Sequence, residues 1–476
     1  MEPALERAGP SGDEESPEER AWTRRILALA LILGLLRFAF LSRWSLWLDE
    51  AYTLSDSRQA WELRNPLGYA VFGAFYRCFE GRPSEALLRL PGAVFGWLAI
   101  ALSAWMLRAW VKPLPAAIAS LVLALSPWHL YWSQNARFYT LAQVLGLLGS
   151  TLVFAGLVRG KELRLLAGLA LVGLSALVHP SAAFLLGACL FVPWLARERL
   201  GSGRVWWTLG GLALVAGLAG SLWFAEVWAT WERRQGRGNP GHFVLTTGYL
   251  LTPSVAGAAC LGAFSGLRAR LREASFLVPF VGAGFAAALC SSFFVRVSAQ
   301  YVFVFLPFVA ALAAHPFGAL FRRAPRRACL LLGLVLAPLA VESGLYFAVR
   351  HGDRPRWKEA YRYVFDRRDP QDLVLGMDAP VGEYYWSPRN SDLRHWRAVV
   401  LLDSYRSRAA EEWLRTERAM WLVVNLEELE DWAEVDRRDM RRFLEEDCRV
   451  AARFPVPLTP RDLDVLVYRY EPGDAD

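Results

Sequence analysis

The chain is dominated by long apolar stretches that short polar connections separate. A helix needs about 20 apolar residues to cross the hydrocarbon of a bilayer, and fewer where it is re-entrant or where the bilayer is locally thin. On this measure the hydropathy pattern predicts about eleven membrane-spanning helices. They lie at residues 25–42, 87–110, 114–129, 139–158, 163–178, 180–196, 205–228, 246–265, 274–294, 299–320 and 328–349.

The distribution of basic residues predicts how these helices are oriented. One set of alternate connections carries fifteen Arg and Lys residues, whereas the opposite set carries five. Because Arg and Lys in short loops stay on the cytoplasmic side, the richer set is expected in the cytoplasm. Residues 1–24 begin with an acidic stretch that contains Pro, Gly and Ser, and we expect them to form a disordered cytoplasmic N-terminus. The loop at 42–87 and the whole C-terminal part are then expected outside the cytoplasm.

Two regions on this outer side have patterns that differ from those of the spans. Within the loop at 42–87, apolar residues recur as on one face of a helix, which predicts helices lying in the membrane interface. From residue 350, short apolar runs at 372–377, 398–402, 420–425 and 464–470 predict strands, and helix-like stretches lie at 357–367 and 427–446. The predicted fold is therefore mainly α: a polytopic transmembrane bundle over 25–349, followed by a small α/β domain over 350–476.

Composition supports an integral membrane protein. Hydrophobic residues make up 54% of the chain, and 21 residues are Trp, which favours the membrane–water interface. The net charge of +7 would suggest nucleic acid in a soluble protein, but most of the arginines lie in connections between spans, so no nucleic-acid partner is expected. Only three of the 53 basic residues are Lys, a bias typical of a GC-rich bacterial genome. We therefore expect a multi-pass protein of the bacterial inner membrane with a periplasmic C-terminal domain.

An acidic pair, Asp49 and Glu50, follows the first predicted span and is framed by aromatic residues. Such a pair can cap the start of an interfacial helix, where the helix dipole favours carboxylates. It can also supply a catalytic base, since a carboxylate can accept a proton from a hydroxyl group. The sequence leaves both interpretations open.

Further candidate residues fall on the same predicted outer face. Arg137 and Arg296 could bind a phosphate, because a guanidinium group donates two parallel hydrogen bonds to it, although Arg137 could also simply reach the headgroups from the interface. His179 stands at an abrupt turn, where a histidine can equally serve structure. Side chains near these positions could hold a sugar ring or an isoprenoid tail: Tyr52, Tyr69, Gln134, Tyr139 and Tyr301.

The sequence contains no evident metal-binding pattern. Its six cysteines show no Cys-x-x-Cys spacing and no accompanying histidine pattern, so we predict neither a zinc site nor a redox site. No cofactor is required by the candidate residues, and a divalent cation is left as an option.

The order of several short motifs resembles that of the GT-C glycosyltransferases. These motifs are Trp47-Leu48-Asp49-Glu50, Asn65-Pro66-Leu67-Gly68-Tyr69, Arg89-Leu90-Pro91, Ser126-Pro127, the stretch from Tyr131 to Tyr139, and His179-Pro180. The chain is most similar to the bacterial branch that includes protein O-mannosyltransferase-like enzymes and the aminoarabinose transferase of lipid A. The resemblance covers nearly the whole chain, including Trp357-Lys358-Glu359-Ala360 at the start of the C-terminal domain.

This resemblance implies inverting transfer of a sugar from a polyprenyl-phosphate donor to a lipid, glycan or protein acceptor on the periplasmic side. It also implies that Asp49 is the base and that outer-loop arginines bind the lipid phosphate. Two positions depart from the family pattern: Asn135 replaces an acidic residue, and Gln300 precedes Tyr301 where an Arg-Tyr pair is frequent. Arg296 lies four residues before Gln300 and would compensate if both share a helix face.

Two other functions stay open on the sequence. A transporter or flippase of lipid-linked saccharides would distribute polar residues through the depth of the bundle, whereas the ionisable residues here concentrate on the outer side. A non-catalytic receptor would bind envelope glycans through its C-terminal domain without turnover. Membrane lipids are partners in every case.

Overall fold

The structure is a computed structural model, and it describes most of the chain. The described residues are 15–62, 65–79, 83–159, 161–195, isolated positions between 196 and 234, 235–386, 398–402, 418–430, 432–459 and 461–472. The predicted span at 205–228 therefore lies almost wholly outside the described residues.

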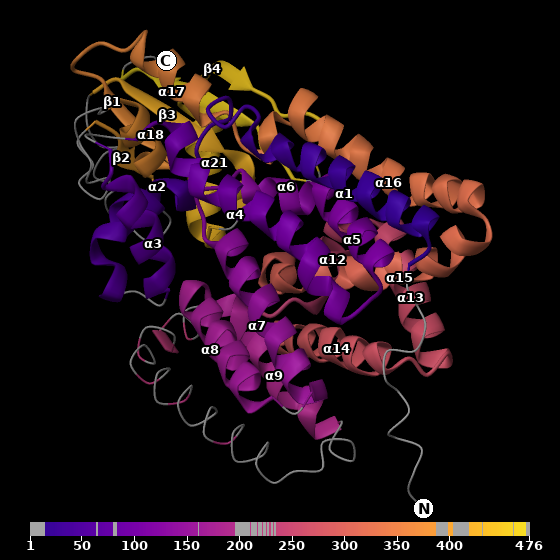
Figure 1. The fold of residues 1–476 in the computed structure, drawn as a ribbon. Helices are drawn as coiled ribbons and strands as arrows, with labels where there is room; N and C mark the ends of the chain where they lie inside the picture. The colour runs from indigo at the N-terminus through magenta and orange to yellow at the C-terminus, as the bar shows by residue number, and fades with distance from the viewer. Residues whose placement is uncertain are drawn as a thin grey trace, which may run out of the picture.

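The larger part of the molecule is a bundle of helices (Figure 1). It contains α1 (Pro17–Gly34), α4 (Glu85–Met106), α5 (Pro113–Leu125), α6 (Pro127–Ser133), α7 (Tyr139–Arg159), α8 (Glu162–Val178), α9 (Ala183–Leu195), α12 (Pro240–Leu251), α13 (Pro253–Arg268), α14 (Arg272–Ser292), α15 (Leu306–Arg323) and α16 (Pro325–Ala348). Glycines let α7 and α8 pack closely, because a Cβ on Gly149 or Gly168 would lie within 2.7 Å of backbone atoms of the facing helix.

Several of these helices can cross a membrane. Five stretches are long and apolar enough: Glu85–Ala109, Tyr139–Val158, Ala274–Ser292, Ala299–Arg323 and Pro325–Ala348. The bent pairs α5–α6 and α12–α13, with angles of 65° and 93°, raise the number to seven among the described residues if each pair is one span. The second helix of each pair begins with a proline, which lacks the N–H that would continue the first helix. The predicted number of eleven spans is not confirmed.

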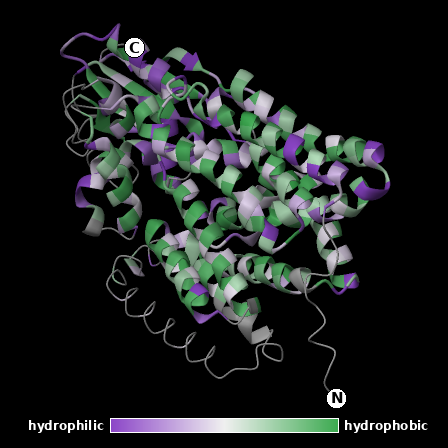
Figure 2. Ribbon diagram, viewed as in Figure 1, coloured by the Kyte–Doolittle hydropathy of each residue, from purple (hydrophilic) through white to green (hydrophobic). Residues whose placement is uncertain are grey.

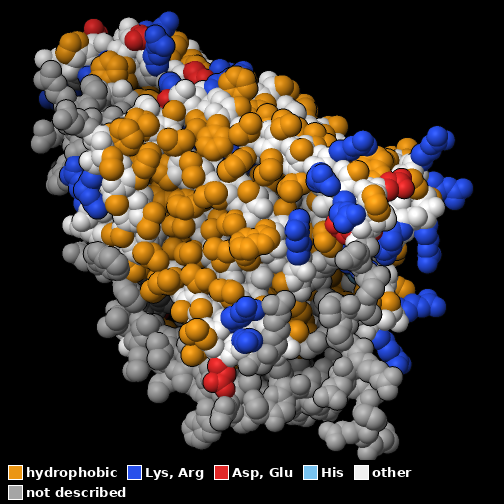
Figure 3. Space-filling model, viewed as in Figure 1, with side chains coloured by type: hydrophobic (Ala, Val, Ile, Leu, Met, Phe, Trp, Pro, Cys, Tyr) orange, Lys and Arg blue, Asp and Glu red, His pale blue; other side chains and the backbone are white. Residues whose placement is uncertain are grey.

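Hydropathy along the ribbon agrees with a membrane location (Figure 2). Hydrophobic residues dominate the bundle helices, and the face seen in Figure 3 carries a broad band of hydrophobic side chains. Mostly basic side chains gather at the end opposite the C-terminal domain. These features support a membrane protein.

The first helix starts earlier than the sequence pattern predicts. α1 begins at Pro17, where the Ser16 side chain accepts a hydrogen bond of 3.1 Å from the backbone N–H of Glu19. Glu18 and Glu19 lie in the first turn, where the helix dipole favours acidic residues. The prediction of a disordered N-terminus over residues 1–24 is therefore wrong for residues 17–24, whereas residues 1–14 lie outside the described part.

The C-terminal part forms a small α/β domain. It contains α17 (Trp357–Phe365), β1 (Leu373–Gly376), α18 (Ala379–Trp386), β2 (Val400–Leu401), β3 (Met420–Asn425), α20 (Leu426–Glu430), α21 (Glu434–Glu446), β4 (Arg449–Phe454) and β5 (Val465–Tyr470). The strand order is β2-β1-β3-β5-β4; β2, β1 and β3 are parallel, and β5 is antiparallel to β3 and β4. All four predicted strands are confirmed, whereas β4 and α18 were not predicted.

The loop between α1 and α4 also forms helices. α2 (Leu48–Asp56) contacts α18 of the α/β domain, and α3 (Pro66–Tyr76) contacts α4 and α8 of the bundle, with the 3-10 helix η2 (Ser57–Glu62) between α2 and α3. We call this end of the bundle, where α2, α3 and the α/β domain lie together, the domain end (Figure 1).

Polar contacts hold the α/β domain against the start of α4. The ammonium group of Lys358 donates to both carboxylate oxygens of Glu85 at 3.0 Å, and the hydroxyl of Tyr385 donates to Glu85 Oε1 at 2.8 Å. The hydroxyl of Tyr384 donates to the carbonyl of Pro83 at 2.9 Å. These contacts fix the domain to the start of α4, and α18 also contacts α2.

Candidate functional site

The acidic pair at the start of α2 is divided between two environments. The side chain of Asp49 is 44% exposed, whereas that of Glu50 is fully buried. Both lie in the first turn of α2, and the carboxylate of Glu50 accepts a hydrogen bond of 3.0 Å from the backbone N–H of Trp47, the residue before the helix. Glu50 therefore caps the helix, as one interpretation of the sequence expects, and Asp49 remains accessible.

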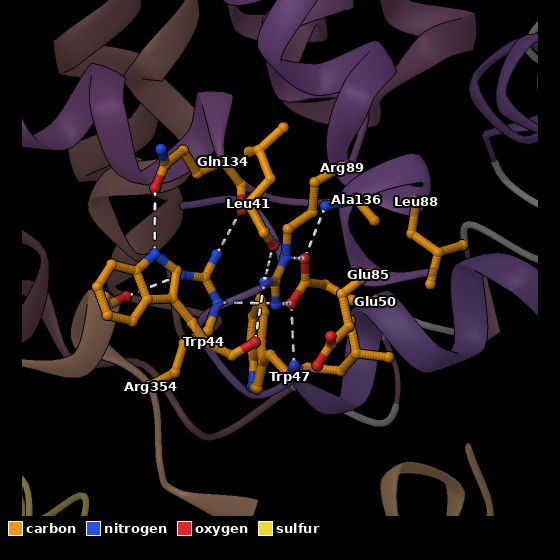
Figure 4. Close-up of polar contacts among 12 residues, drawn as sticks. Leu41, Trp44, Trp47, Glu50, Glu85, Leu88, Arg89, Gln134, Ala136 and Arg354 are labelled. Carbon is orange, nitrogen blue, oxygen red and sulfur yellow. Dashed lines mark hydrogen bonds and ion pairs between the residues drawn. The ribbon is translucent and has the colours of Figure 1, made fainter. Parts of the chain in front are cut away.

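Glu50 is enclosed by cationic and backbone donors (Figure 4). Arg89 donates from Nε to Oε1 and from Nη2 to Oε2, each at 2.8 Å, and the backbone N–H of Ala136 donates to Oε1 at 2.9 Å. Arg354 Nε lies 3.4 Å from Oε2. Burial alone would raise the pKa of Glu50, but the charges of Arg89 and Arg354 lower it to about 2. Glu50 is thus an ionised and fully engaged group, and its proposed part in catalysis stays untested.

The buried Arg89 also fixes the chain just before α2. Its guanidinium donates to three carbonyl groups of the segment that leads into the helix, those of Leu41, Trp44 and Ser45, at 2.7–3.0 Å. The ion pair with Glu50 and these three bonds set the position of α2, and therefore the position of Asp49.

Gln134 belongs to the same buried network (Figure 4). Its Oε1 accepts hydrogen bonds from the indole of Trp44 at 3.3 Å and from the hydroxyl of Tyr346 at 3.0 Å. Its Nε2 donates to the carbonyls of residues 36, 37 and 39, and its backbone carbonyl accepts from Arg354 Nη2 at 2.8 Å. The side chain is fully buried, so the predicted substrate contact of Gln134 remains untested beside an evident structural role.

Arg137 lies on the short connection between α6 and α7, beside Asp49. Its Nη2 is 4.0 Å from Asp49 Oδ2, and its Nη1 donates to the hydroxyl of Thr53 at 3.1 Å and to that of Tyr69 at 3.4 Å. The guanidinium also stacks over the ring of Phe138, 5.0 Å from its centroid. The structure therefore brings together three of the predicted residues, Asp49, Arg137 and Tyr69.

An aromatic row crosses the domain end of the bundle. Trp47 neighbours Trp132 with ring centroids 6.3 Å apart, and Trp132 contacts Tyr139 at 4.0 Å. Tyr139 contacts His179 at 4.2 Å, and His179 neighbours Tyr301 at 6.4 Å. Three further predicted residues are thereby aligned from α2 to the 3-10 helix η6 (Ala299–Phe305). His179 also contacts the hydroxyl of Ser181 through Nδ1 at 2.8 Å, which fits the structural interpretation of this residue.

Two predicted residues lie elsewhere. Arg296 is exposed on the connection between α14 and η6. This connection is extended at Ser298, and η6 begins only at Ala299, so the prediction that Arg296 and Gln300 share a helix face is wrong. Tyr52 lines a cleft between α2 and the α/β domain.

Sequence reasoning missed the partners of Glu50. Arg89 lies within the apolar helix α4, and a charged residue inside a span is a signal of function or of a buried ion pair that could have identified it. Arg354 follows the last span, where nothing in the local pattern marks it. The buried Asp378, which lines the same cleft as Tyr52, was also missed.

No metal site is evident in the described part of the chain. Among the described residues, no group of three or more His, Cys, Asp or Glu side chains is arranged to hold a metal ion. Asp49 faces a guanidinium group, and Asn135, which takes the place of a second carboxylate, is a buried neutral amide. These residues do not fit a divalent cation.

Comparisons with known proteins identify the fold. No protein-family model matches the sequence, and no curated protein matches it. Apo ArnT from Cupriavidus metallidurans matches with a TM-score of 0.56 at 14% identity, over 95% of this chain and 98% of that chain. ArnT bound to undecaprenyl phosphate matches with the same TM-score and identity, over 94% of this chain and 98% of that chain.

An archaeal enzyme matches as well. The oligosaccharyltransferase AglB from Archaeoglobus fulgidus, in complex with an inhibitory peptide and a dolichol-phosphate, has a TM-score of 0.58 at 13% identity, over 97% of this chain and 75% of that chain. ArnT and AglB are GT-C glycosyltransferases, so the chain has the GT-C fold, and the resemblance inferred from the motifs is confirmed at the level of the fold. Since one fold can host several functions, the fold alone does not identify the reaction.

Proposed function

We propose that this chain is a glycosyltransferase that moves a sugar, with inversion, from a polyprenyl-phosphate donor to a lipid, glycan or protein acceptor at the domain end. One observation carries the proposal: the half-exposed carboxylate of Asp49 lies 4.0 Å from the buried guanidinium of Arg137. This reaction needs a base for the attacking hydroxyl and a cation for the departing phosphate, side by side.

In the proposed reaction, Asp49 takes the proton of an acceptor hydroxyl. The hydroxyl oxygen attacks the anomeric carbon of the donor on the face opposite the phosphate, and the bond between that carbon and the phosphate oxygen breaks. The electron pair leaves with the lipid phosphate, so the products are the glycosylated acceptor, the free lipid phosphate and protonated Asp49. A single displacement of this kind inverts the anomeric configuration.

Arg137 is suited to the departing phosphate. Its described hydrogen bonds to Asp49, Thr53 and Tyr69 all use Nη1, and its Nε has no hydrogen-bond partner. Nε is buried, so we expect a phosphate oxygen to contact Nη2, on the side where the carboxylate of Asp49 lies 4.0 Å away. A fixed cation beside the leaving oxygen stabilises the charge that develops as the bond breaks.

The aromatic row supports the choice of a lipid-linked donor. Trp132, Tyr139 and Tyr301 form part of a continuous series of rings that starts beside α2 and runs across the bundle. Trp132 and Tyr139 are buried by the protein, so an isoprenoid chain would gain apolar contacts at the less buried ends of the row, Trp47 and Tyr301. The neighbouring structures bound to undecaprenyl phosphate and to dolichol-phosphate support the same donor class.

Within this proposal, Glu50 is a positioning residue. Its carboxylate is engaged by Arg89, Arg354 and two backbone N–H groups, and its lowered pKa makes it a weak proton acceptor. It holds the first turn of α2 in place, which in turn holds Asp49 against Arg137.

We further propose a multi-pass protein of the bacterial inner membrane whose domain end faces the periplasm. The basic connection between α15 and α16, with Arg322, Arg323, Arg326 and Arg327, would then be cytoplasmic. Figure 3 supports this orientation, since Lys and Arg side chains gather at the end opposite the α/β domain.

The test is transfer by the purified chain in lipid nanodiscs. Radiolabelled polyprenyl-phosphate hexoses and pentoses are supplied with an extract of bacterial envelope as acceptor, and label leaving the polyprenyl phosphate is measured. The proposal expects label in the acceptor fraction together with release of lipid phosphate. Binding of the donor without turnover would favour a receptor, and movement of intact donor across a liposome membrane would favour a flippase.

A further inference from the structure

A cleft of about 200 Å³ lies between α2 and the α/β domain. Its wall on the bundle side comes from Leu48 and Tyr52 of α2. Its wall on the domain side includes Met377, Asp378 and Glu428, and Trp432 lies beside them. The cleft thus combines aromatic and aliphatic surfaces with two carboxyl groups.

The sheet topology explains why polar groups meet here. β2, β1 and β3 are parallel, so their carboxyl ends lie at one edge of the sheet. Met377 and Asp378 directly follow β1, Leu401 ends β2, and Glu428 lies just after β3. β1 lies between β2 and β3, so the connections that follow β1 and β2 run to opposite sides of β1. In open α/β sheets, ligands bind in the crevice that forms outside the carboxyl ends of the strands at such a position.

Asp378 is the feature that the fold alone does not explain. Its residue is only 1% exposed, and its Oδ2 has no hydrogen-bond partner. The indole N–H of Trp357 faces this carboxyl group but does not complete a hydrogen bond with it. Burying a polar group without a partner costs about 1–3 kcal/mol, so a native structure retains one where a ligand or water completes it.

We propose that this cleft is a binding subsite for one neutral sugar ring of the acceptor, hydrogen-bonded through its hydroxyl groups to Asp378 and Glu428 and packed against Tyr52 and Trp432. The ring would be the part of the acceptor next to the attacking hydroxyl. This role rests on the glycosyl transfer proposed above, whereas the binding itself does not.

The dimensions and the surfaces of the cleft fit this ligand. Pockets for drug-sized ligands measure about 300–1,000 Å³, so a cleft of about 200 Å³ has room for a single ring. A sugar ring presents hydroxyl groups at its rim and C–H groups on its faces, which matches carboxyl groups beside aromatic rings. Burial raises the pKa of Asp378, and Glu428 and Asp49 raise it further, so this group can donate a hydrogen bond as well as accept one.

The helix α2 connects the cleft to the reacting groups. Leu48 and Tyr52 lie four residues apart and share the face that lines the cleft. Asp49 and Thr53 also lie four residues apart and share the neighbouring face, which contacts Arg137. Asp49 therefore lies between Arg137, which is proposed to bind the phosphate, and the cleft. A base in this position can reach a hydroxyl group of an acceptor bound in the cleft.

The experiment measures binding of methyl glycosides of glucose, mannose and galactose to the full chain in nanodiscs by saturation-transfer NMR. We expect the wild-type protein to bind at least one glycoside and Asp378→Leu to bind it at least about tenfold more weakly, since two hydrogen bonds are lost. Asp378→Leu should nevertheless keep or raise the thermal midpoint, because it removes an unpartnered buried polar group. Trp432→Ala tests the aromatic wall, and Asp366→Asn, at an exposed site of the same domain, is the control.

Each outcome decides the proposal. Binding that is lost in Asp378→Leu and Trp432→Ala but kept in Asp366→Asn supports the subsite. Glycoside binding that is absent from the wild-type protein, or equal in all variants, overturns it. Retention of undecaprenyl phosphate is measured by native mass spectrometry on the same samples. Retention without glycoside binding refutes the subsite alone, whereas glycoside binding without retention counts against the donor in the proposed function.

Discussion

The carboxylate of Glu50 accepts a hydrogen bond of 2.8 Å from each of two nitrogens of Arg89, and neither side chain is exposed. This bidentate pair joins the first turn of α2 to α4, and Arg354 joins the same carboxylate to the segment that precedes the α/β domain. Through these contacts, Glu50 holds α2, the helix that carries Asp49, against both the bundle and the segment that leads into the α/β domain.

We expect the loss of one partner of this pair to unfold the domain end. Glu50→Gln or Arg89→Met leaves an uncompensated buried charge, which costs about 3–5 kcal/mol. The measurement is the thermal midpoint of the purified protein in detergent, together with its amount in membranes. Glu446→Gln, which removes an exposed i,i+4 partner of Arg442, should change the midpoint little. An unchanged midpoint in Glu50→Gln would contradict the structural role.

Arg137 is predicted to govern binding of the lipid phosphate. Arg137→Lys keeps the positive charge but loses the planar guanidinium group with its paired N–H donors, and Arg137→Met loses both. A charge-assisted hydrogen bond contributes about 1.5–3 kcal/mol, so Arg137→Met should weaken binding of undecaprenyl phosphate by roughly 10- to 100-fold, and Arg137→Lys should weaken it less. Native mass spectrometry in nanodiscs measures this affinity. Arg77→Met, at an exposed position in the loop between α1 and α4, is the control. Equal affinity in Arg137→Met and wild type would exclude the assigned phosphate site.

Asp353 makes the stability of the domain end depend on pH. Burial raises the pKa of its carboxyl group from 3.8 to about 6, although Arg350 and Arg354 oppose this rise. The folded protein thus holds this proton more tightly than the unfolded chain, and its stability falls as the pH rises from about 4 to about 6. Asp353→Asn should remove this loss and raise the free energy of unfolding by about 1–3 kcal/mol at pH 8, with little change at pH 4.

Asn is a suitable replacement because Asp353 has a φ of +52°, a conformation that Asn tolerates. The measurement is the difference in thermal midpoint between variant and wild type across this pH range. Asp366→Asn, at an exposed position, should show no such trend. If the difference in thermal midpoint between Asp353→Asn and wild type stays constant with pH, Asp353 is not the group that makes stability depend on pH.

Much of the fold could be predicted from the sequence because its signals are local. Apolar length identified the bundle helices, and short apolar runs identified the strands β1, β2, β3 and β5. α18 was not predicted because it is short, and β4 was not predicted because it lacks an apolar run: β4 is exposed at three of its six positions. The start of α1 was missed because a capping residue and acidic residues set it, not apolar length.

The site was predictable only in part. Asp49, Arg137 and Tyr69 were named from residue type and motif order, and the structure brings them together. The helix-face argument for Arg296 failed because Ser298 is extended, which residue spacing alone does not reveal. The partners of Glu50 and the cleft at Asp378 depend on segments that are distant in sequence, so only the tertiary structure shows them.

The central claim is that Asp49 accepts the proton of the attacking hydroxyl. The most direct test compares sugar transfer from a radiolabelled polyprenyl-phosphate sugar by membranes that contain wild-type protein or Asp49→Asn. We predict a fall in rate of about 10²- to 10⁴-fold, because general base catalysis contributes that much, with the thermal midpoint and the binding of undecaprenyl phosphate maintained. Full transfer by Asp49→Asn would contradict this account.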